Sequence, residues 1–105
     1  MAFFRRKSTA VGGRSSGREE LAHLEEFVRT RRGVEGFIEP RTTVTETTLL
    51  LIAHDGEWTR RRMTNPQAAR QFAHRLSMPV YDIALVGYPQ RMRDYNERKK
   101  RESTD

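Results

Sequence analysis

The clearest pattern in this chain is an apolar run and a half-polar run separated by a polar corner. Residues 49–53 are all apolar, whereas residues 58–63 begin with tryptophan, end with methionine and hold three consecutive arginines. Between them, Asp55 and Gly56 can take the positive φ angles of a two-residue type I′ turn, whose twist matches that of paired strands. The pattern predicts a β-hairpin over residues 49–63.

The register of this hairpin decides which face of the sheet each arginine occupies. Counting outward from a two-residue turn places Leu51 opposite Arg60 and Leu50 opposite Arg61. The apolar strand has hydrophobic side chains on both faces, so we expect it in the centre of the sheet. The arginine-bearing strand is expected nearer an edge, where arginine stems cover apolar surface and their charged ends reach water.

The segment before the hairpin predicts one helix. Ser16 followed three residues later by Glu19 is a capping-box signature, and apolar residues then recur at helical spacing as far as Val28. Arginines follow near the negative end of the helix dipole, and Gly33 can supply a left-handed cap. The helix therefore accounts for these arginines without a ligand.

Two further helices are expected after the hairpin. Asn65 is a suitable cap, and Pro66 suits the first turn, where its missing N–H costs no hydrogen bond. The alanines that follow lie on one stripe and allow close packing on the sheet. Residues 89–105 are strongly charged, and we expect a short helix that frays at its end.

The remaining segments predict two more strands. Residues 34–39 are short and rich in β-branched or aromatic side chains, and Pro40 indicates an edge position. Residues 80–87 are either a fourth strand, which we favour, or a loop with an apolar turn. The expected fold class is α+β, a small antiparallel sheet of three or four strands with helices packed on it, in the order α-β-β-β-α-β-α.

Charge is uneven along the chain. We expect a disordered basic tail over residues 1–15, an α+β domain over 16–88, and a charged C-terminal helix and tail over 89–105. The formal net charge is +6; residues 1–18 carry five basic and no acidic side chains, whereas residues 19–88 carry nine basic and ten acidic ones. The basicity therefore lies in the tails, which favours electrostatic contact between the ends of the chain and something acidic.

Composition limits the compartment and the cofactors. The chain has 105 residues with 35% hydrophobic content, which is enough for one domain with a modest core. It has no cysteine, which excludes disulfides and thiolate chemistry and fits a cytoplasmic location. No run approaches the roughly 18 apolar residues of a spanning helix, and Phe3 and Phe4 bury too little for stable membrane insertion. No cofactor is expected.

Two motifs resemble those of a known group of proteins. Phe-Ile-Glu-Pro-Arg-Thr at residues 37–42 and His-Asp-Gly-Glu-Trp-Thr-Arg-Arg at residues 54–61 are similar to segments of small uncharacterised actinobacterial proteins. The resemblance covers residues 33–82, about half of the chain. It implies a bacterial cytosolic origin and assigns no activity, catalytic residue or binding residue.

Candidate catalytic residues are sparse. His23, His54 and His74 lie in different predicted elements without the spacing of metal ligands, so no metal site is expected. His54 beside Glu57 is either an acid/base pair or, as we favour, an exposed cross-strand pair. The sequence has no phosphate-binding glycine loop and no nucleophile elbow. An enzyme is therefore not expected, although a deep pocket with His54 or Asp82 would favour one.

The strongest functional signal is cationic and aromatic. Guanidinium groups bind phosphates bidentately, and aromatic rings stack on unpaired bases. We therefore expect a small non-enzymatic accessory protein that binds nucleic acid or a ribonucleoprotein through the hairpin and the basic tails. The residues expected to make these contacts are Trp58, Arg60, Arg61, Arg62, Arg70, Arg91, Arg93, Lys99 and Lys100.

Two other interpretations compete with nucleic-acid binding. Tyr88, Met92 and Tyr95 form a narrow stripe at helical spacing, which predicts a module that docks on a protein partner. Alternatively, Trp58 is a core or edge aromatic and the arginines are solvated strand ends. Binding to RNA or DNA that weakens steeply with salt would favour the nucleic-acid hypothesis.

Overall fold

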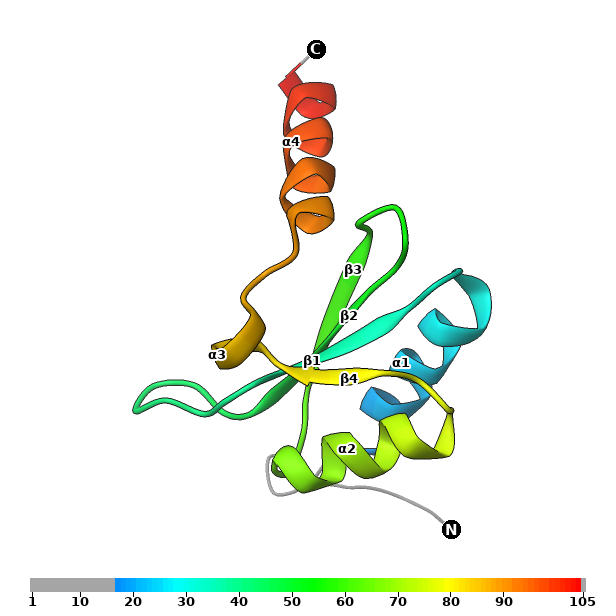
Figure 1. Cartoon of the computed structure of the whole chain (residues 1–105), viewed down its shortest axis with the longest axis vertical. Coiled ribbons are helices and arrows are strands. Elements are labelled where there is room, and N and C mark those ends of the chain that lie inside the picture. Colours follow the sequence, from blue (N-terminus) through cyan, green and yellow to red (C-terminus); the bar gives the residue numbers. More distant parts are fainter. Residues whose placement is uncertain (1–16, 105) are drawn as a thin grey trace, which may run out of the picture.

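Helices and strands follow one another in the predicted α+β order (Figure 1). This computed structural model describes residues 17–104, so the predicted disordered tail at residues 1–15 and the predicted cap Ser16 lie outside the described residues. The elements are α1 (Arg18–Thr30), β1 (Glu35–Glu39), β2 (Thr48–Ile52), β3 (Trp58–Arg62), α2 (Pro66–Arg75), β4 (Val80–Asp82), α3 (Ile83–Val86) and α4 (Gln90–Thr104). The predicted fold class is confirmed.

The strands form one mixed sheet in the order β3-β2-β1-β4. β1 and β3 pair antiparallel with β2, as predicted, whereas β4 joins parallel to β1 and makes the sheet mixed. β3 is an edge strand as expected, but the edge position predicted for β1 is wrong. Pro40 comes after Glu39, the last residue of β1, so it removes no hydrogen bond from the ladder.

The hairpin loop between β2 and β3 holds three residues and not the predicted two. The Ala53 N–H donates to the Glu57 carbonyl over 2.8 Å, and the Gly56 N–H donates back to the Ala53 carbonyl over 3.0 Å. Gly56 has a φ of 95°, whereas Asp55 does not take a positive φ. A type I′ turn needs positive φ at both central residues, so the loop is of the three-residue kind with a bulge glycine.

The extra loop residue shifts the pairing of β2 with β3. Leu50 lies opposite Arg60, and Leu49 lies opposite Arg61. Because side chains alternate across a strand, a shift of one residue moves every β3 side chain to the other face of the sheet relative to β2. The predicted pairing of Leu51 with Arg60 is therefore wrong, and the two arginines have exchanged faces.

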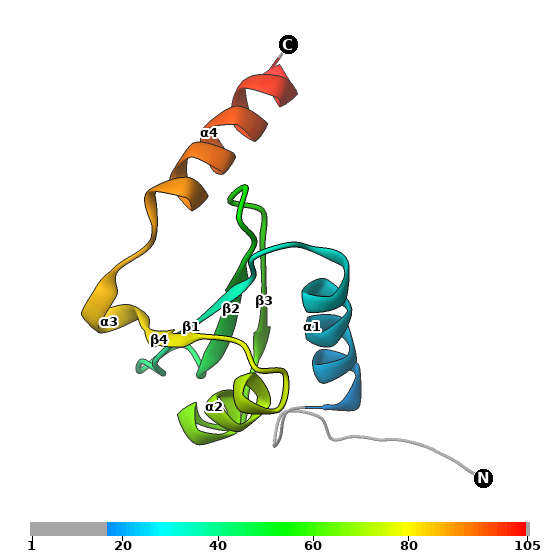
Figure 2. The ribbon, with the colours of Figure 1, turned by 45° about the vertical axis from the view of Figure 1, so that its right-hand side comes forward.

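Helices cover both faces of the sheet. α1 and α2 pack on one face (Figure 2), where the larger cluster of buried side chains lies. α3 and the start of α4 cover part of the other face, whose buried side chains are Phe37, Leu50, Ile52 and Met92. Leu50 and Leu51 are both fully buried although they point to opposite faces, which explains why the apolar run of β2 is continuous.

The apolar stretch at residues 80–87 changes structure part of the way along. β4 ends at Asp82, whose carboxylate accepts a hydrogen bond from the Ala84 N–H over 2.9 Å and so begins α3. The short helix ends at Val86 and is followed by Gly87, which has a φ of 76°. The strand and the apolar turn, which are alternatives in the sequence, both occur, one after the other.

The helices on the first face follow their sequence signals in part. The Asn65 side chain accepts the Ala68 N–H over 2.8 Å, so the predicted cap of α2 is confirmed. α1 ends at Thr30, earlier than the predicted cap at Gly33. Gly33 has a φ of 60° in the turn toward β1, where it lies against His54.

Candidate functional site

Arg60 is held by a glutamate of the same sheet. Its Nε donates to Glu39 Oε1 over 2.9 Å, and its Nη2 donates to Oε2 over 2.7 Å. The hydroxyls of Thr48 and Tyr88 donate to the same carboxylate, each over 2.6 Å. The Arg60 guanidinium also lies over the Trp58 ring, 5.1 Å from its centroid. This bidentate pair neutralises the Arg60 charge, which weakens the attraction of Arg60 for a phosphate.

Arg61 lies on the opposite face of the sheet, beside α1. Its Nη1 donates to the Arg60 carbonyl over 2.9 Å, and its Nη2 lies 3.3 Å from His23 Nδ1. His23 Nε2 lies 2.7 Å from the Thr59 hydroxyl oxygen. A neutral imidazole can accept from Arg61 at one nitrogen and donate to Thr59 from the other. Arg61 and His23 therefore join α1 to the edge strand.

Arg62 has acidic neighbours from two other segments. Its Nη2 lies 3.9 Å from the Glu20 carboxylate in α1, and its Nε lies 3.4 Å from the Glu46 carboxylate. Consecutive residues of a strand point to opposite faces. Arg61 therefore points away from Arg60, and each arginine of the triplet has partners within the protein.

The contacts of His23 predict a pH dependence of stability. Burial lowers the pKa of His23, and the nearby Arg61 and Arg31 charges lower it further from the ordinary value of 6.5. The unfolded chain then binds more protons between the two pKa values, so stability is complete above pH 6.5 and falls as the pH drops through the lowered pKa. In urea unfolding from about pH 7.5 to about pH 5.5, the wild type is expected to lose stability more steeply than a His23→Gln variant. Equal slopes would contradict this assignment.

The first turns of α4 are docked on the sheet and on the hairpin loop. Met92 is buried in the second face of the sheet. Trp58 Nε1 donates to Asn96 Oδ1 over 2.8 Å, and Arg91 Nε donates to the Ala53 carbonyl over 3.0 Å. Met92 therefore packs inside the molecule, which contradicts its predicted role in a docking stripe.

The other predicted contact residues are spread over two helices. Arg93, Lys99 and Lys100 are exposed on α4, which leaves the rest of the molecule after its first turns (Figures 1 and 2). Arg70 is exposed on α2, which covers the other face of the sheet. Tyr95 of the predicted stripe is half buried on α4. The structure thus brings Trp58, Arg60 and α4 together, and it separates Arg61 and Arg70 from them.

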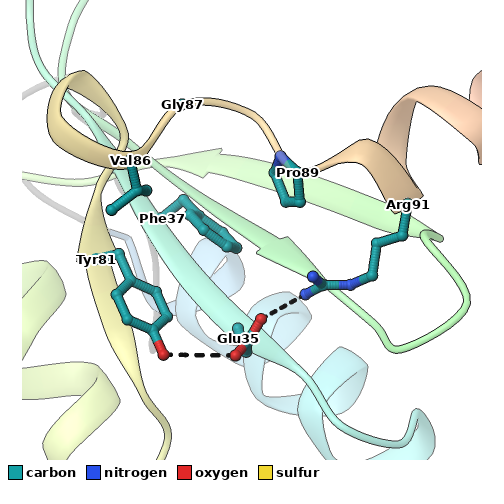
Figure 3. Close-up of a pocket in the computed structure, with 7 residues that line it drawn as sticks. All are labelled: Glu35, Phe37, Tyr81, Val86, Gly87, Pro89 and Arg91. Carbon is teal, nitrogen blue, oxygen red and sulfur yellow. Dashed lines mark hydrogen bonds and ion pairs between the residues drawn. The ribbon is translucent and has the colours of Figure 1, made fainter.

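A hollow of about 230 Å³ lies where α3 leads into α4 (Figure 3). Its lining residues are Glu35, Phe37, Tyr81, Val86, Gly87, Pro89 and Arg91. The rings of Phe37 and Tyr81 lie beside each other, with centroids 5.5 Å apart. Glu35 accepts a hydrogen bond from Arg91 Nη2 over 2.6 Å and a longer one from the Tyr81 hydroxyl over 3.5 Å. The hollow thus combines an aromatic floor with a carboxylate at its edge.

Large apolar side chains stand exposed beside this hollow. Leu85 is 84% exposed and Val86 is 55% exposed, and Tyr81 and Tyr88 are also exposed. We call these four residues the α3 corner. Leaving apolar surface in water costs roughly 25 cal/mol per Å², and exposed apolar patches mark interaction sites. The α3 corner with its hollow is therefore the best candidate functional site in the described part of the chain.

Only Tyr88 of the α3 corner was among the residues expected to bind a partner. Leu85 and Val86 were missed because residues 80–87, which are rich in apolar side chains, also suit a strand. The signal that identifies them is Gly87-Tyr88-Pro89, since glycine and proline end a strand and leave the preceding apolar residues at a surface turn.

The catalytic arrangements considered from the sequence do not come together. Glu57 accepts a hydrogen bond from Arg31 over 2.7 Å, and His54 is exposed at the loop. Residues 17–104 contain no group of three or more histidine, aspartate or glutamate side chains placed to hold a metal ion. Over the same residues, the helices are all too short or too polar to cross a membrane. No family model, curated protein or solved structure matches this chain.

Proposed function

We propose that this protein is a small interaction module that binds a partner protein through the α3 corner. The observation that carries the proposal is the exposure of Leu85 and Val86 next to a hollow with an aromatic floor. The hydrophobic effect favours covering such side chains, and protein interfaces are built around apolar and aromatic anchors.

The rigidity of the α3 corner supports this role. The Tyr88 hydroxyl is fixed by Glu39 over 2.6 Å, and the Tyr81 ring packs against Phe37. The Asp82 side chain caps α3. A surface that is already ordered loses less conformational entropy on binding than a flexible one.

Nucleic-acid binding is a second candidate, which the exposed cations of α4 support. Arg93 and Lys100 are exposed on α4, whose later turns project from the rest of the molecule (Figure 1). Acidic residues on the same helix reduce this charge, since Glu97 pairs with Arg101 over 3.2 Å. Such a helix supports weak binding that depends on salt.

Replacing Leu85 and Val86 together by serine is expected to remove partner binding and to leave the fold intact, because both side chains are exposed. The probe is a displayed library of random dodecapeptides selected on the immobilised wild-type chain. Enriched sequences are synthesised and titrated by fluorescence anisotropy. The double variant is expected to bind them at least tenfold more weakly, a loss of about 1.4 kcal/mol. Circular dichroism checks that the fold is retained.

Val44→Ser is the matched control for this experiment. Val44 is 88% exposed, on the loop between β1 and β2, and does not line the hollow. This variant is expected to bind the enriched peptides like the wild type. The proposal fails if no peptide is enriched, or if the double variant binds as tightly as the wild type. Retention of labelled RNA or DNA alone, lost steeply with salt, would favour the second candidate.

A further inference from the structure

Two glutamates of β1, Glu35 and Glu39, each bind one arginine and one tyrosine on the same face of the sheet. The side chains are Arg60 and Tyr88 at Glu39, and Arg91 and Tyr81 at Glu35. Phe37 lies between the two glutamates, because alternate residues of a strand share a face. The two groups share an arginine and a tyrosine, so a comparison of their remaining contacts is informative.

In the group around Glu39, all acceptor sites of the carboxylate are occupied. Its carboxylate accepts hydrogen bonds of between 2.6 and 2.9 Å from Thr48, Arg60 and Tyr88. The Glu39 side chain is 13% exposed. A carboxylate has about four lone-pair sites, and these contacts use them. The Glu39 group therefore stabilises the fold and leaves no acceptor for a ligand.

The group around Glu35 is open. Arg91 binds Oε1 over 2.6 Å, but within residues 17–104 the only hydrogen bond to Oε2 is the 3.5 Å contact from the Tyr81 hydroxyl. That length is beyond the usual range for an O–H donor. The Glu35 side chain is 32% exposed and lines the hollow (Figure 3). Glu35 Oε2 can therefore accept a stronger hydrogen bond from a ligand.

We propose that the hollow takes one apolar side chain of an uncharged peptide segment, and that a main-chain N–H of this segment donates to Glu35 Oε2. The apolar side chain lies over Phe37, between Tyr81 and Pro89. This inference rests on the proposed function, since it names the chemistry of the partner at the same corner.

The size of the site favours a short segment. A hollow of about 230 Å³ is smaller than the roughly 300–1,000 Å³ of sites for drug-sized molecules, and it suits a single side chain. Each partner in a stable complex of folded proteins usually buries roughly 800 Å². The four exposed side chains of the α3 corner supply less area than that. A second copy of this chain is therefore a poorer occupant than a peptide segment with one anchor residue.

The charges at the hollow favour an uncharged segment. Arg91 and Glu35 neutralise each other across 2.6 Å, and Arg91 Nε is already bound to the Ala53 carbonyl. Neither an acidic nor a basic peptide gains from this pair. Binding is therefore expected to change less than twofold between low and physiological salt, unlike binding to a phosphate backbone.

The test is a double-mutant cycle that combines one change in the protein with one change in the peptide. The probe is the synthetic peptide enriched from the random library, titrated against the full chain. In Glu35→Gln the amide oxygen can still accept from Arg91, but the amide presents N–H donors to the hollow. This variant, and N-methylation of one peptide amide beside the anchor residue, are each expected to weaken binding about tenfold. Together they are expected to weaken it no more than either alone.

Two controls separate this effect from a loss of structure. Trp58 is the single tryptophan of the chain and donates to Asn96 of α4, so unchanged Trp58 fluorescence shows that α4 is still docked. Val44→Ser changes an exposed side chain that does not line the hollow, so it is expected to bind the peptide like the wild type. If Glu35→Gln releases α4, the hydrogen bond to Glu35 is instead tested by titrating the N-methylated peptides against the wild-type chain.

The possible outcomes distinguish this inference from the proposed function. This inference is overturned if the affinity losses from Glu35→Gln and from N-methylation add. It is also overturned if N-methylation weakens binding equally at every position, or if binding falls steeply with salt. A peptide that loses binding to the Leu85 and Val86 double variant but not to Glu35→Gln would leave the proposed function standing without this inference. Binding that is unaffected by the double variant would overturn both.

Discussion

A Gly56→Ala variant is expected to lose about 2–4 kcal/mol of unfolding free energy. Gly56 has a φ of 95°, a region of backbone conformation that costs an L-residue about 1–2 kcal/mol. A Cβ at this position would also overlap the carbonyl oxygen of Arg91 and lie 2.8 Å from the Tyr95 Cβ. The overlapping atom belongs to the backbone, so a change of rotamer cannot relieve the clash. Either the hairpin loop or α4 must move.

Trp58 fluorescence reports this movement. The Trp58 ring donates to Asn96 on α4, so displacement of α4 is expected to shift the emission of the folded protein to longer wavelength. Urea unfolding followed by circular dichroism gives the loss of stability separately. Both changes are expected in Gly56→Ala.

Gly87→Ala is the matched control for this variant. Gly87 also has a positive φ, of 76°, but a Cβ there would meet no atom within 4 Å. It is therefore expected to cost about 1–3 kcal/mol through backbone strain alone and to keep the native Trp58 emission. Equal losses and equal emission in the two variants would show that the hairpin loop does not restrain α4.

The hairpin illustrates which parts of the fold are visible in the sequence. The apolar run and the polar corner are local features, and they locate both strands and the turn. The register is not visible, because Asp-Gly also suits a three-residue loop in which Asp55 Oδ1 accepts the Glu57 N–H over 3.0 Å. One residue in the loop decides whether Arg60 or Arg61 faces α4, and the loop length is the property of the hairpin that the sequence leaves open.

The candidate site is less visible than the fold, because its residues are distant in the chain. Glu35 and Arg91 are 56 positions apart, and Glu39 and Tyr88 are 49 apart. No periodicity or motif joins such pairs. The charge count does indicate such pairs, since residues 19–88 carry nine basic and ten acidic side chains. A balanced domain offers internal partners to its arginines, and the structure shows Arg60 and Arg62 using them.

A Glu39→Ala variant is expected to lose about 2 kcal/mol of unfolding free energy at neutral pH. The change leaves Arg60, Thr48 and Tyr88 without their shared acceptor. The loss is smaller than the roughly 3–5 kcal/mol of a fully buried pair, because the partly exposed Arg60 can turn to water. Tyr88→Phe removes one neutral donor and is expected to cost about 1 kcal/mol or less.

The loss in Glu39→Ala is expected to depend on pH in a defined direction. Burial raises the pKa of Glu39, but hydrogen bonds from Arg60, Thr48 and Tyr88 outweigh it and hold the pKa below the ordinary value of 4.5. The unfolded chain therefore binds a proton at higher pH than the folded one, so this stabilisation is complete above about pH 4.5 and is lost as the pH falls through the lowered pKa.

Urea unfolding of the wild type and of Glu39→Ala is expected to show the largest difference near neutral pH and convergence in acid; a constant difference would contradict the assignment. The same carboxylate fixes the Tyr88 hydroxyl at the α3 corner. Protonation of Glu39 is therefore expected to loosen Tyr88 and to weaken binding of the enriched peptide over the same pH range. In Tyr88→Phe, which lacks that hydroxyl, the acid-dependent part of the affinity loss is expected to disappear.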